Sequence, residues 1–299
     1  MTDGWITGTF VFVPGRRGVR FFLYLDHKEK RNKKQIKEEA NMKYGLCTDL
    51  FYLEIGPAGP VFSDTNKLLA GMDLAKKTGL KAVEFWDWFG RDWEALLAKK
   101  EEYGLAVTAI CSKDRGNLDD PEKRDVALAG LKETIEVAKK FNCPNIIVTA
   151  GDKQDVDRCA ARKSIIEGLK EMAPLAEEAG VTLILEPISG GYFVDSKEPF
   201  EIIDEVGSPN VKLLYDIFHY QMMEGNIVAT IKANIDKIGH FHAACVPGRN
   251  EITKGELDYR FVFREIDKTG YQGYVGMEYL PTMDKEESVR DFMSLMESL

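Results

Sequence analysis

The stretches VKLLYDIFH, residues 211–219, and IGHFH, residues 238–242, decide how this chain folds. In each, an apolar run ends in side chains that can bind a metal: Asp216 and His219 after the first, His242 at the end of the second. A helix-length segment separates the two stretches. A buried strand that ends on a carboxylate or an imidazole delivers that group to one end of a sheet. Two such strands in succession therefore predict a site at a common strand-end face.

The same unit, a short apolar strand followed by an amphipathic helix, recurs from residue 43 onward. Several units join at a polar helix end, a glycine and then an apolar strand, as at Gly79, Gly104 and Gly180. Glycine is expected there because it adopts the left-handed conformation that ends a helix. Eight strands are predicted in this way, at residues 44–47, 82–85, 106–110, 145–148, 182–185, 211–215, 239–241 and 274–277.

Strands that alternate with helices imply a parallel sheet with right-handed crossovers. Eight such units in about 250 residues fit a (β/α)₈ TIM barrel. A doubly wound open sheet is the alternative, but no Gly-x-Gly-x-x-Gly follows the first strand. No change of composition marks a linker after residue 42, so we expect one catalytic barrel domain over residues 42–299.

Residues 1–41 do not match this repeating unit. Apolar runs on either side of Pro14-Gly15 predict a hairpin, and residues 28–37 form a basic run with no apolar face. We interpret residues 1–41 as an N-terminal extension, either a hairpin plus a basic segment or a disordered appendage. A basic arm that binds a partner is the alternative interpretation.

Composition limits the classes of partner. The net charge of −9 and a pI near 5.2 disfavour a nucleic-acid groove or an anionic membrane surface. Five cysteines, odd in number and without close pairs, indicate reduced thiols in a cytoplasmic protein. No apolar run approaches the roughly 20 residues that span a bilayer. We expect a small-molecule substrate, no nucleic-acid or membrane partner, and leave room for a homo-oligomer.

Four polar side chains lie at the ends of the last four predicted strands. One such carboxylate is more often a helix cap, but four candidate ligands at four consecutive strand ends rarely arise by chance. Adjacent strands of a barrel would bring them together at its C-terminal mouth. Three carboxylates and one imidazole favour Mn²⁺ or Mg²⁺ over a structural zinc site. The four are Glu186, Asp216, His242 and Glu278.

Motifs in the same region resemble those of the xylose-isomerase-like barrel enzymes, and within them the hydroxypyruvate isomerases. They are LEPI at 185–188, YDIFH at 215–219, QMMEG at 221–225, IGHFH at 238–242, VPGRNE at 246–251, GELDY at 255–259 and GMEY at 276–279. The resemblance covers about residues 43–299. It implies one divalent metal held by Glu186, Asp216, His242 and Glu278, with Glu186 and Glu278 doubling as the acid/base pair and His219 and Arg249 gripping substrate oxygens.

The resemblance implies a metal-dependent isomerase that converts hydroxypyruvate to tartronate semialdehyde through an enediolate. A ketose 3-epimerase is the second choice, because some hydroxypyruvate isomerases place glutamine where this chain has His242 and the ketose 3-epimerases place histidine. A dehydratase of a cyclic polyol ketone ranks third, and a non-catalytic sugar-binding barrel is the alternative of another class. Phosphodiester cleavage would require more histidines than the four of this chain.

Other side chains near strand ends have two interpretations. Arg249, after Pro247-Gly248, carries a guanidinium that can bind a carboxylate in bidentate fashion, or it is an arginine of a surface loop. The aromatic run at 85–89 either forms the wall of a substrate pocket or has a packing role, between a helix and a loop or at a subunit contact. His240 lies deeper along its strand than His242, in the core or behind the site. We interpret three further groups near strand ends as solvated or structural: Glu84, Lys113 and Lys153.

Overall fold

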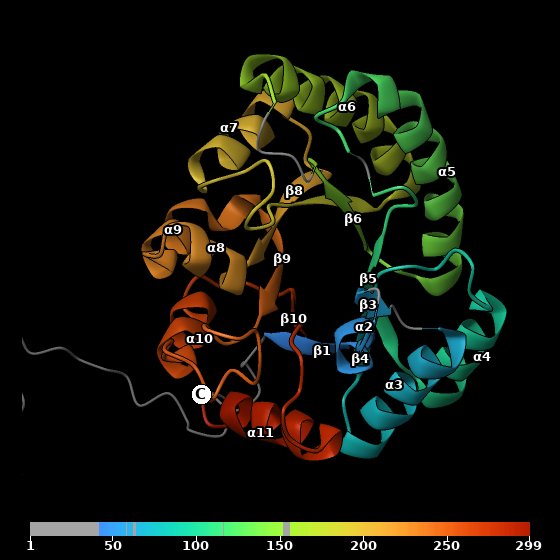
Figure 1. Cartoon of the computed structure of the whole chain (residues 1–299), viewed down its shortest axis with the longest axis vertical. Coiled ribbons are helices and arrows are strands. Elements are labelled where there is room, and N and C mark those ends of the chain that lie inside the picture. The colour runs from blue at the N-terminus through green and yellow to red at the C-terminus, as the bar shows by residue number, and fades with distance from the viewer. Residues whose placement is uncertain (1–41, 58, 62–63, 116, 152–155) are drawn as a thin grey trace, which may run out of the picture. The chain divides into compact units, whose positions relative to one another are not determined.

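The computed structural model describes residues 42–299, apart from residues 58, 62–63, 116 and 152–155. Within this part, eight parallel strands close into a barrel in the order β1-β10-β9-β8-β7-β6-β5-β4 (Figure 1). The predicted TIM barrel is confirmed, and each predicted strand lies within an observed one. The strands are β1 (Lys43–Cys47), β4 (Ala82–Phe85), β5 (Ala106–Cys111), β6 (Asn145–Thr149), β7 (Thr182–Glu186), β8 (Val211–Asp216), β9 (Ile238–Ala243) and β10 (Tyr274–Met277).

Helices surround the barrel on its outside (Figure 1). Glycines in the left-handed conformation end several of them, as the sequence predicts: Gly79 has φ 90° and Gly104 has φ 64°. Asn142, with φ 51°, fills the same position where no glycine is present. The helices are α2 (Thr48–Phe51), α3 (Thr65–Thr78), α4 (Trp93–Tyr103), α5 (Arg124–Phe141), α6 (Arg158–Ala179), α7 (Lys197–Val206), α8 (Ile217–Met223), α9 (Ile227–Asn234), α10 (Tyr259–Asp267) and α11 (Lys285–Glu297), with single 3₁₀ turns at Pro121–Lys123 and Ile235–Lys237.

A short hairpin between α2 and α3 was not predicted. Its strands, β2 (Glu54–Gly56) and β3 (Gly59–Val61), pair antiparallel outside the barrel. Both strands have only three residues and contain glycine, and β3 contains Pro60, so no alternating apolar pattern marks them. The predicted extension over residues 1–41 lies outside the described residues. Among the described helices, none combines the length and apolar character that a membrane span requires.

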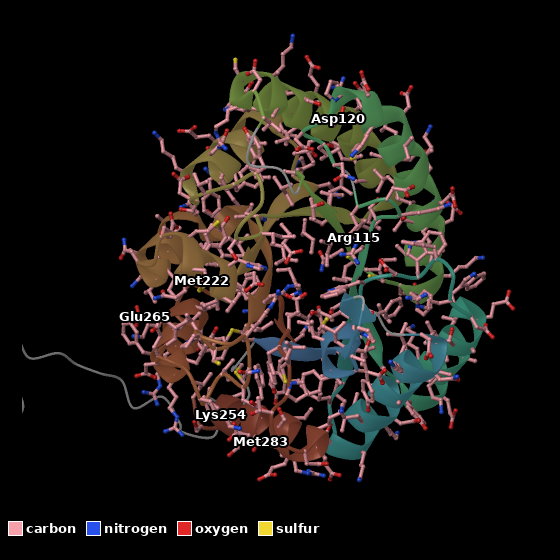
Figure 2. The ribbon with its side chains drawn as sticks, viewed as in Figure 1. Arg115, Asp120, Met222, Lys254, Glu265 and Met283 are labelled. Carbon is pink, nitrogen blue, oxygen red and sulfur yellow. The ribbon has the colours of Figure 1, made fainter. Side chains whose placement is uncertain are left out.

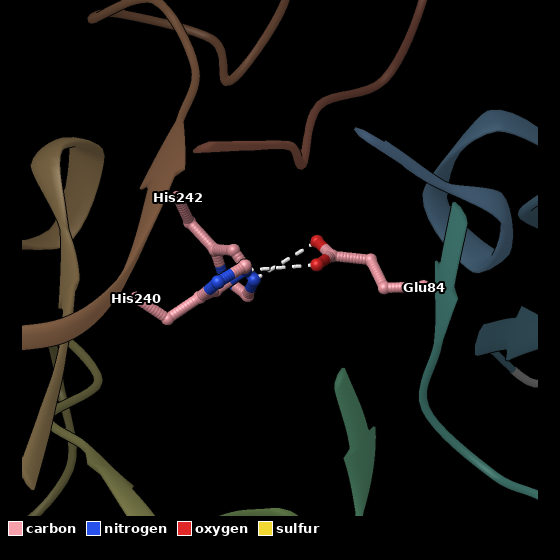
Figure 3. Close-up of side chains that lie close together, drawn as sticks. All are labelled: Glu84, His240 and His242. Carbon is pink, nitrogen blue, oxygen red and sulfur yellow. Dashed lines mark hydrogen bonds and ion pairs between the residues drawn. The ribbon is translucent and has the colours of Figure 1, made fainter. Parts of the chain in front are cut away.

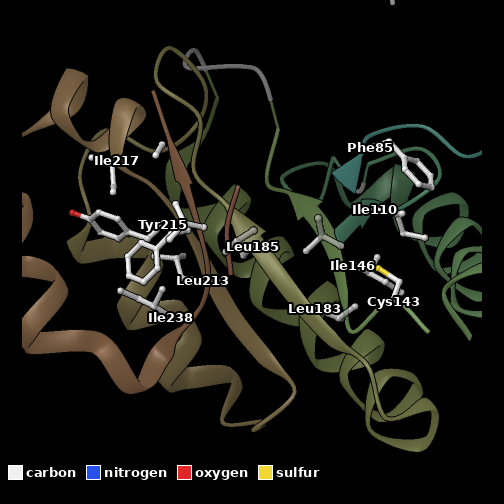
Figure 4. Close-up of a cluster of buried hydrophobic side chains, with 14 of the residues drawn as sticks. Phe85, Ile110, Cys143, Ile146, Leu183, Leu185, Leu213, Tyr215, Ile217 and Ile238 are labelled. Atoms are coloured by element: carbon white, nitrogen blue, oxygen red, sulfur yellow. The ribbon is translucent and has the colours of Figure 1, made fainter. Parts of the chain in front are cut away.

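The apolar core has two parts. The larger part fills the space between the outer face of the strands and the helices, and includes Leu213 and Ile238 (Figure 4). The smaller part lies among side chains of four adjacent strands: Ala109, Cys111, Ile147, Ile184 and Leu214, with Trp86 packed against it. In a TIM barrel such side chains fill the interior, so a packed layer of apolar side chains lies below the C-terminal mouth.

We predict that Ile184→Ala lowers the free energy of unfolding by about 3 kcal/mol, because the side chain is fully buried and its removal leaves a cavity. Urea unfolding followed by circular dichroism measures the change. The control is Val126→Ala on α5, where the side chain is 55% exposed and little should change. Equal effects of the two substitutions would contradict a packed interior.

Candidate metal centre

The structure brings together the four predicted ligands at the C-terminal ends of β7 to β10. One donor atom from each of the four lies within 4.8 Å of the others, and all four side chains are buried. Strand register explains the meeting: Asp216 on β8 pairs with His242 on β9, and His242 pairs with Gly276 on β10, two residues before Glu278. The set is Glu186, Asp216, His242 and Glu278.

The two carboxylate oxygens of Asp216 have different roles: one caps a helix and the other faces the candidate centre. Its Oδ1 caps α8 by accepting from the backbone N–H of Phe218 at 2.8 Å and of His219 at 3.4 Å. Its Oδ2 lies 3.1 Å from Arg249 Nη2 and 3.5 Å from His219 Nε2. The cap therefore fixes the carboxylate so that one oxygen faces the centre.

His242 faces carboxylates on both sides of its ring. Its Nδ1 lies 2.9 Å from Glu278 Oε2 and 3.5 Å from Glu186 Oε1, while its Nε2 lies 3.0 Å from Glu84 Oε1. Burial lowers the pKa of His242, but the charges of Glu278 and Glu84 outweigh burial and hold that pKa well above 6.5. The surrounding carboxylates therefore favour the protonated imidazole.

Arg249 also points into the centre. Its Nη2 donates to Asp216 Oδ2 at 3.1 Å and to Glu278 Oε2, and its guanidinium lies 5.3 Å from the ring centroid of Phe218. Burial lowers the pKa of Arg249, but the carboxylates of Glu278 and Asp216 raise it above the usual value. The residue has a left-handed backbone, φ 54°, and its N–H donates to Cys245 O at 3.0 Å. A turn of the β9 loop thus directs the guanidinium inward.

His219 lies at the edge of the centre with a defined tautomer. The backbone N–H of Ser189 donates to His219 Nδ1 at 3.3 Å, and Ser189 Oγ lies 2.9 Å from the same nitrogen. Because Nδ1 accepts from that N–H, the ring proton belongs on Nε2, the nitrogen that faces Asp216. His219 therefore presents a donor toward Asp216 and the candidate centre.

Trp86 is a site residue that the sequence did not single out from its aromatic run. Its indole Nε1 donates to Glu278 Oε1 at 3.0 Å, and the Arg115 guanidinium lies 5.2 Å from its ring centroid. Arg115 pairs with Asp87 at 3.0 Å and lies beside β5 (Figure 2). The indole thus walls the centre. A tryptophan one residue after a strand was the available signal, but nothing in the sequence distinguished it from Trp88, which donates to Thr134 instead.

The remaining strand-end groups have different positions. Glu84 is buried inside the barrel, where it contacts His240 and His242. The interpretation of Lys113 as a solvated group fits its ion pair with Glu133 at 2.8 Å, where both side chains are part-exposed. Lys153 lies outside the described residues.

The donor set fits a divalent cation. Three carboxylates and one imidazole supply oxygen-rich coordination, and His242 Nδ1 is buried without a well-directed hydrogen bond in the described part of the chain. Such a nitrogen facing two carboxylates either carries a proton or ligates a metal. These residues therefore form a candidate metal centre.

The fold and the centre together define a class: a TIM barrel with candidate ligands at the ends of four consecutive strands. The family model described as xylose isomerase-like TIM barrel matches residues 72–299, so the chain belongs to this family. The prediction of an isomerase-type enzyme related to the hydroxypyruvate isomerases is confirmed at this level.

Three relatives illustrate the similarity. The hydroxypyruvate isomerase of Escherichia coli is 30% identical, over 74% of this chain and 91% of its own. The 2-oxo-tetronate isomerase of Cupriavidus necator is 33% identical, over 69% of this chain and 85% of its own. The D-psicose 3-epimerase of Clostridium cellulolyticum, solved with D-tagatose, shares the fold with a TM-score of 0.69 and 21% identity, covering 86% of this chain and 95% of that one.

Glu251 anchors the loop that carries Arg249. Its carboxylate accepts from Thr282 N and Thr282 Oγ1, both at 2.8 Å, from Met283 N at 3.0 Å and from Ser288 Oγ at 3.2 Å. Burial raises the pKa of Glu251, but these donors outweigh burial and lower it from 4.5 to about 2. The carboxylate thus ties the β9 loop to the segment before α11.

We predict that Glu251→Gln lowers the free energy of unfolding by about 2 kcal/mol at neutral pH, since charge-assisted hydrogen bonds are lost. The folded-state pKa is depressed, so the contribution is complete above pH 4.5 and is lost as the pH falls toward 2. Urea unfolding of both proteins between neutral and acid pH measures the difference. A difference that grows on acidification would contradict the assignment.

Proposed function

We propose that this chain is a metal-dependent isomerase that interconverts hydroxypyruvate and tartronate semialdehyde. One observation carries the proposal: two buried carboxylates from non-adjacent strands, Glu186 and Glu278, face the same imidazole nitrogen at 3.5 Å and 2.9 Å. Similarity to isomerases that act on hydroxypyruvate and 2-oxo-tetronate, both short keto acids, supports it.

The reaction moves one proton between neighbouring carbons. A base removes a proton from the hydroxymethyl carbon of hydroxypyruvate, which leaves an enediolate. The adjacent carbon then accepts a proton, and the hydroxyl proton passes to the former carbonyl oxygen. Atoms and electrons balance without a redox partner. The base must lie within hydrogen-bonding reach of the reacting carbon.

Each residue of the centre has a role in this scheme. Glu186, Asp216, His242 and Glu278 would hold Mn²⁺ or Mg²⁺, which would polarise the carbonyl and acidify the neighbouring C–H bond. Glu186 and Glu278 would remove and return the carbon proton. Arg249 would bind the substrate carboxylate, and the Nε2–H of His219 would donate to a substrate oxygen. The Trp86 indole would shield that side of the pocket from water.

A ketose 3-epimerase is the second candidate. His242 favours it, because the ketose 3-epimerases carry histidine at the corresponding position. Two carboxylates on opposite faces of a substrate can also exchange a proton at one carbon from both sides, which inverts it. A non-catalytic sugar-binding barrel is disfavoured, because such a protein would not need an intact acid/base pair.

We also propose a cytoplasmic location and a small hydroxy-keto acid or sugar as the ligand. All five cysteines are free thiols, which suits a reducing compartment. The acidic balance of the chain disfavours nucleic acid.

Metal dependence is tested by adding Mn²⁺ to chelator-treated protein. A free concentration of roughly 100 times Kd should stabilise the fold by about 2.7 kcal/mol and raise the melting temperature. Glu186→Gln is the matched variant, because Glu186 ends a strand and caps no helix, and its response to Mn²⁺ should be smaller. No shift with either Mn²⁺ or Mg²⁺ in the unaltered protein would refute the metal centre.

The acid/base role is tested by Glu278→Gln, which keeps the shape of the side chain and removes the proton acceptor. We expect kcat for hydroxypyruvate to fall about 1,000-fold or more while the circular dichroism spectrum stays the same. Glu133→Gln removes a surface carboxylate that pairs with Lys113 and should leave turnover unchanged. Retention of most activity by Glu278→Gln would exclude this residue as acid or base.

Substrate choice is tested by proton exchange with deuterated water. An isomerase of hydroxypyruvate should introduce deuterium into that compound, and an epimerase should introduce it into D-fructose or D-tagatose. Mass spectrometry of the three incubations compares them directly. Exchange with the ketoses alone would replace the first proposal by the second, and exchange with none would favour the non-catalytic barrel.

A further inference from the structure

A buried carboxylate lies behind the metal centre, on the opposite side of the His242 ring. Glu84, on β4, extends across the barrel interior toward His240 and His242 on β9 (Figure 3). Its side chain is only 3% exposed, and the two imidazoles are 0% and 1% exposed. Of the two interpretations of Glu84, solvated or structural, this interior position fits the structural one.

Glu84 uses each oxygen for a different partner. Oε2 lies 2.9 Å from His240 Nε2 and accepts from Thr108 Oγ1 at 2.9 Å, whereas Oε1 lies 3.0 Å from His242 Nε2. The 3.0 Å contact between Glu84 Oε1 and His242 Nε2 is an ion pair, and neither atom has a well-directed hydrogen bond among the described residues. The His242 ring is therefore held at Nε2 by one carboxylate.

Strand β10 leaves room for this pair at Gly276. A Cβ atom added there would lie 2.0 Å from Glu84 Oε1 and 2.8 Å from His242 Cδ2, so a side chain would require Glu84 or the His242 ring to move. Gly276 does not have a positive φ, so the backbone conformation does not require glycine there. Its lack of a side chain instead leaves room for neighbouring side chains. Gly276 thus provides the space in which Glu84 and His242 meet.

We propose that Glu84 is a positioning residue: with His240 and Thr108 behind it, it holds His242 Nε2 so that Nδ1 faces the cation. The inference rests on the metal centre of the proposed function. A carboxylate that binds the second nitrogen of a metal-bound histidine fixes the ring orientation and its tautomer, and makes the ligating nitrogen a better donor. His240 and Thr108 hold the carboxylate itself in place.

A second cation held by Glu84, His240 and His242 is the competing explanation, since their donor atoms also lie within 4.8 Å of one another. The contacts favour positioning. One Glu84 oxygen already has an imidazole and a hydroxyl partner, and the three side chains together supply fewer than the four ligands of a closed site.

The first test measures Mn²⁺ affinity from the electron paramagnetic resonance signal of free Mn²⁺. Glu84→Gln keeps the shape but removes the charge, and should raise Kd about 10–100-fold. Glu265→Gln is the matched control, because Glu265 is also a buried carboxylate and its partners, Lys232 and Lys268, are not part of the candidate centre. Its Kd should stay within about twofold of the unaltered chain even where its stability falls. An equal Kd for Glu84→Gln and the unaltered chain would overturn the inference.

The second test needs no substitution and decides the matter if Glu84→Gln fails to fold. With ¹⁵N-labelled histidine and Cd²⁺ as a diamagnetic probe, nuclear magnetic resonance identifies the bound nitrogen. Nδ1 of His242 should couple to the ion while Nε2 keeps its proton. Coupling at Nε2, or two ions per chain, would overturn the inference.

The two tests also separate this inference from the proposed function. An unaltered chain that binds no divalent cation refutes the metal centre, and the inference with it. A chain that binds Mn²⁺ equally well with and without the Glu84 charge refutes only the positioning role.

Discussion

Charge balance at the mouth of the barrel is the constraint on which the rest of the site depends. Two like charges roughly 4 Å apart repel by about 4 kcal/mol at an effective dielectric constant near 20. The chain nevertheless buries four carboxylates around one imidazole. Positive charge has to be brought to them, and β9 with its following loop supplies both His242 and Arg249. The buried carboxylates are Glu84, Glu186, Asp216 and Glu278.

The parallel register of the barrel makes this balance achievable with side chains that are distant in sequence. Asp216 and His242 pair across neighbouring strands, and His242 pairs with a glycine on the next strand. That glycine, Gly276, lets the Glu84 carboxylate approach the ring from the far side. The strand register thus sets the position of each group along the barrel axis. Gly276, opposite His242, leaves the space that the Glu84 carboxylate occupies. A cation at the mouth would add to a charge arrangement that the fold already holds in place.

The sequence predicted the parts of this arrangement that depend on periodicity. Glycines after polar helix ends located the strands, and strand ends located Asp216 and Glu278 without reference to tertiary packing. It could not predict the direction of Glu84, because the pairing of β4 with β5 shifts register between Val83 and Phe85. Such a shift changes which side chains face the barrel interior, and no pattern of residues in the sequence indicates where it occurs.

Loop residues were harder to place for a related reason. The resemblance to known isomerases named Arg249 as a substrate ligand, but its inward direction depends on the left-handed turn to Cys245 and on the four hydrogen bonds of Glu251. Those contacts join segments that meet only after the barrel closes. The choice of Trp86 over Trp88 depends likewise on Glu278, which lies at the other end of the chain.

Arg249 links the charge balance to substrate binding. Its Nη2 donates to Asp216 Oδ2 and Glu278 Oε2, oxygens that belong to the candidate ligand set. A guanidinium and a divalent cation cannot both bind these oxygens strongly, because they compete for the same lone pairs and the same space. In the proposed enzyme, a cation that binds the carboxylates would release the guanidinium from them. The guanidinium would then require another anion in a half-buried position, and the carboxylate of a short keto acid is an anion that fits it. In the proposed enzyme, the guanidinium that pairs with Asp216 and Glu278 would in this way become the group that binds the substrate.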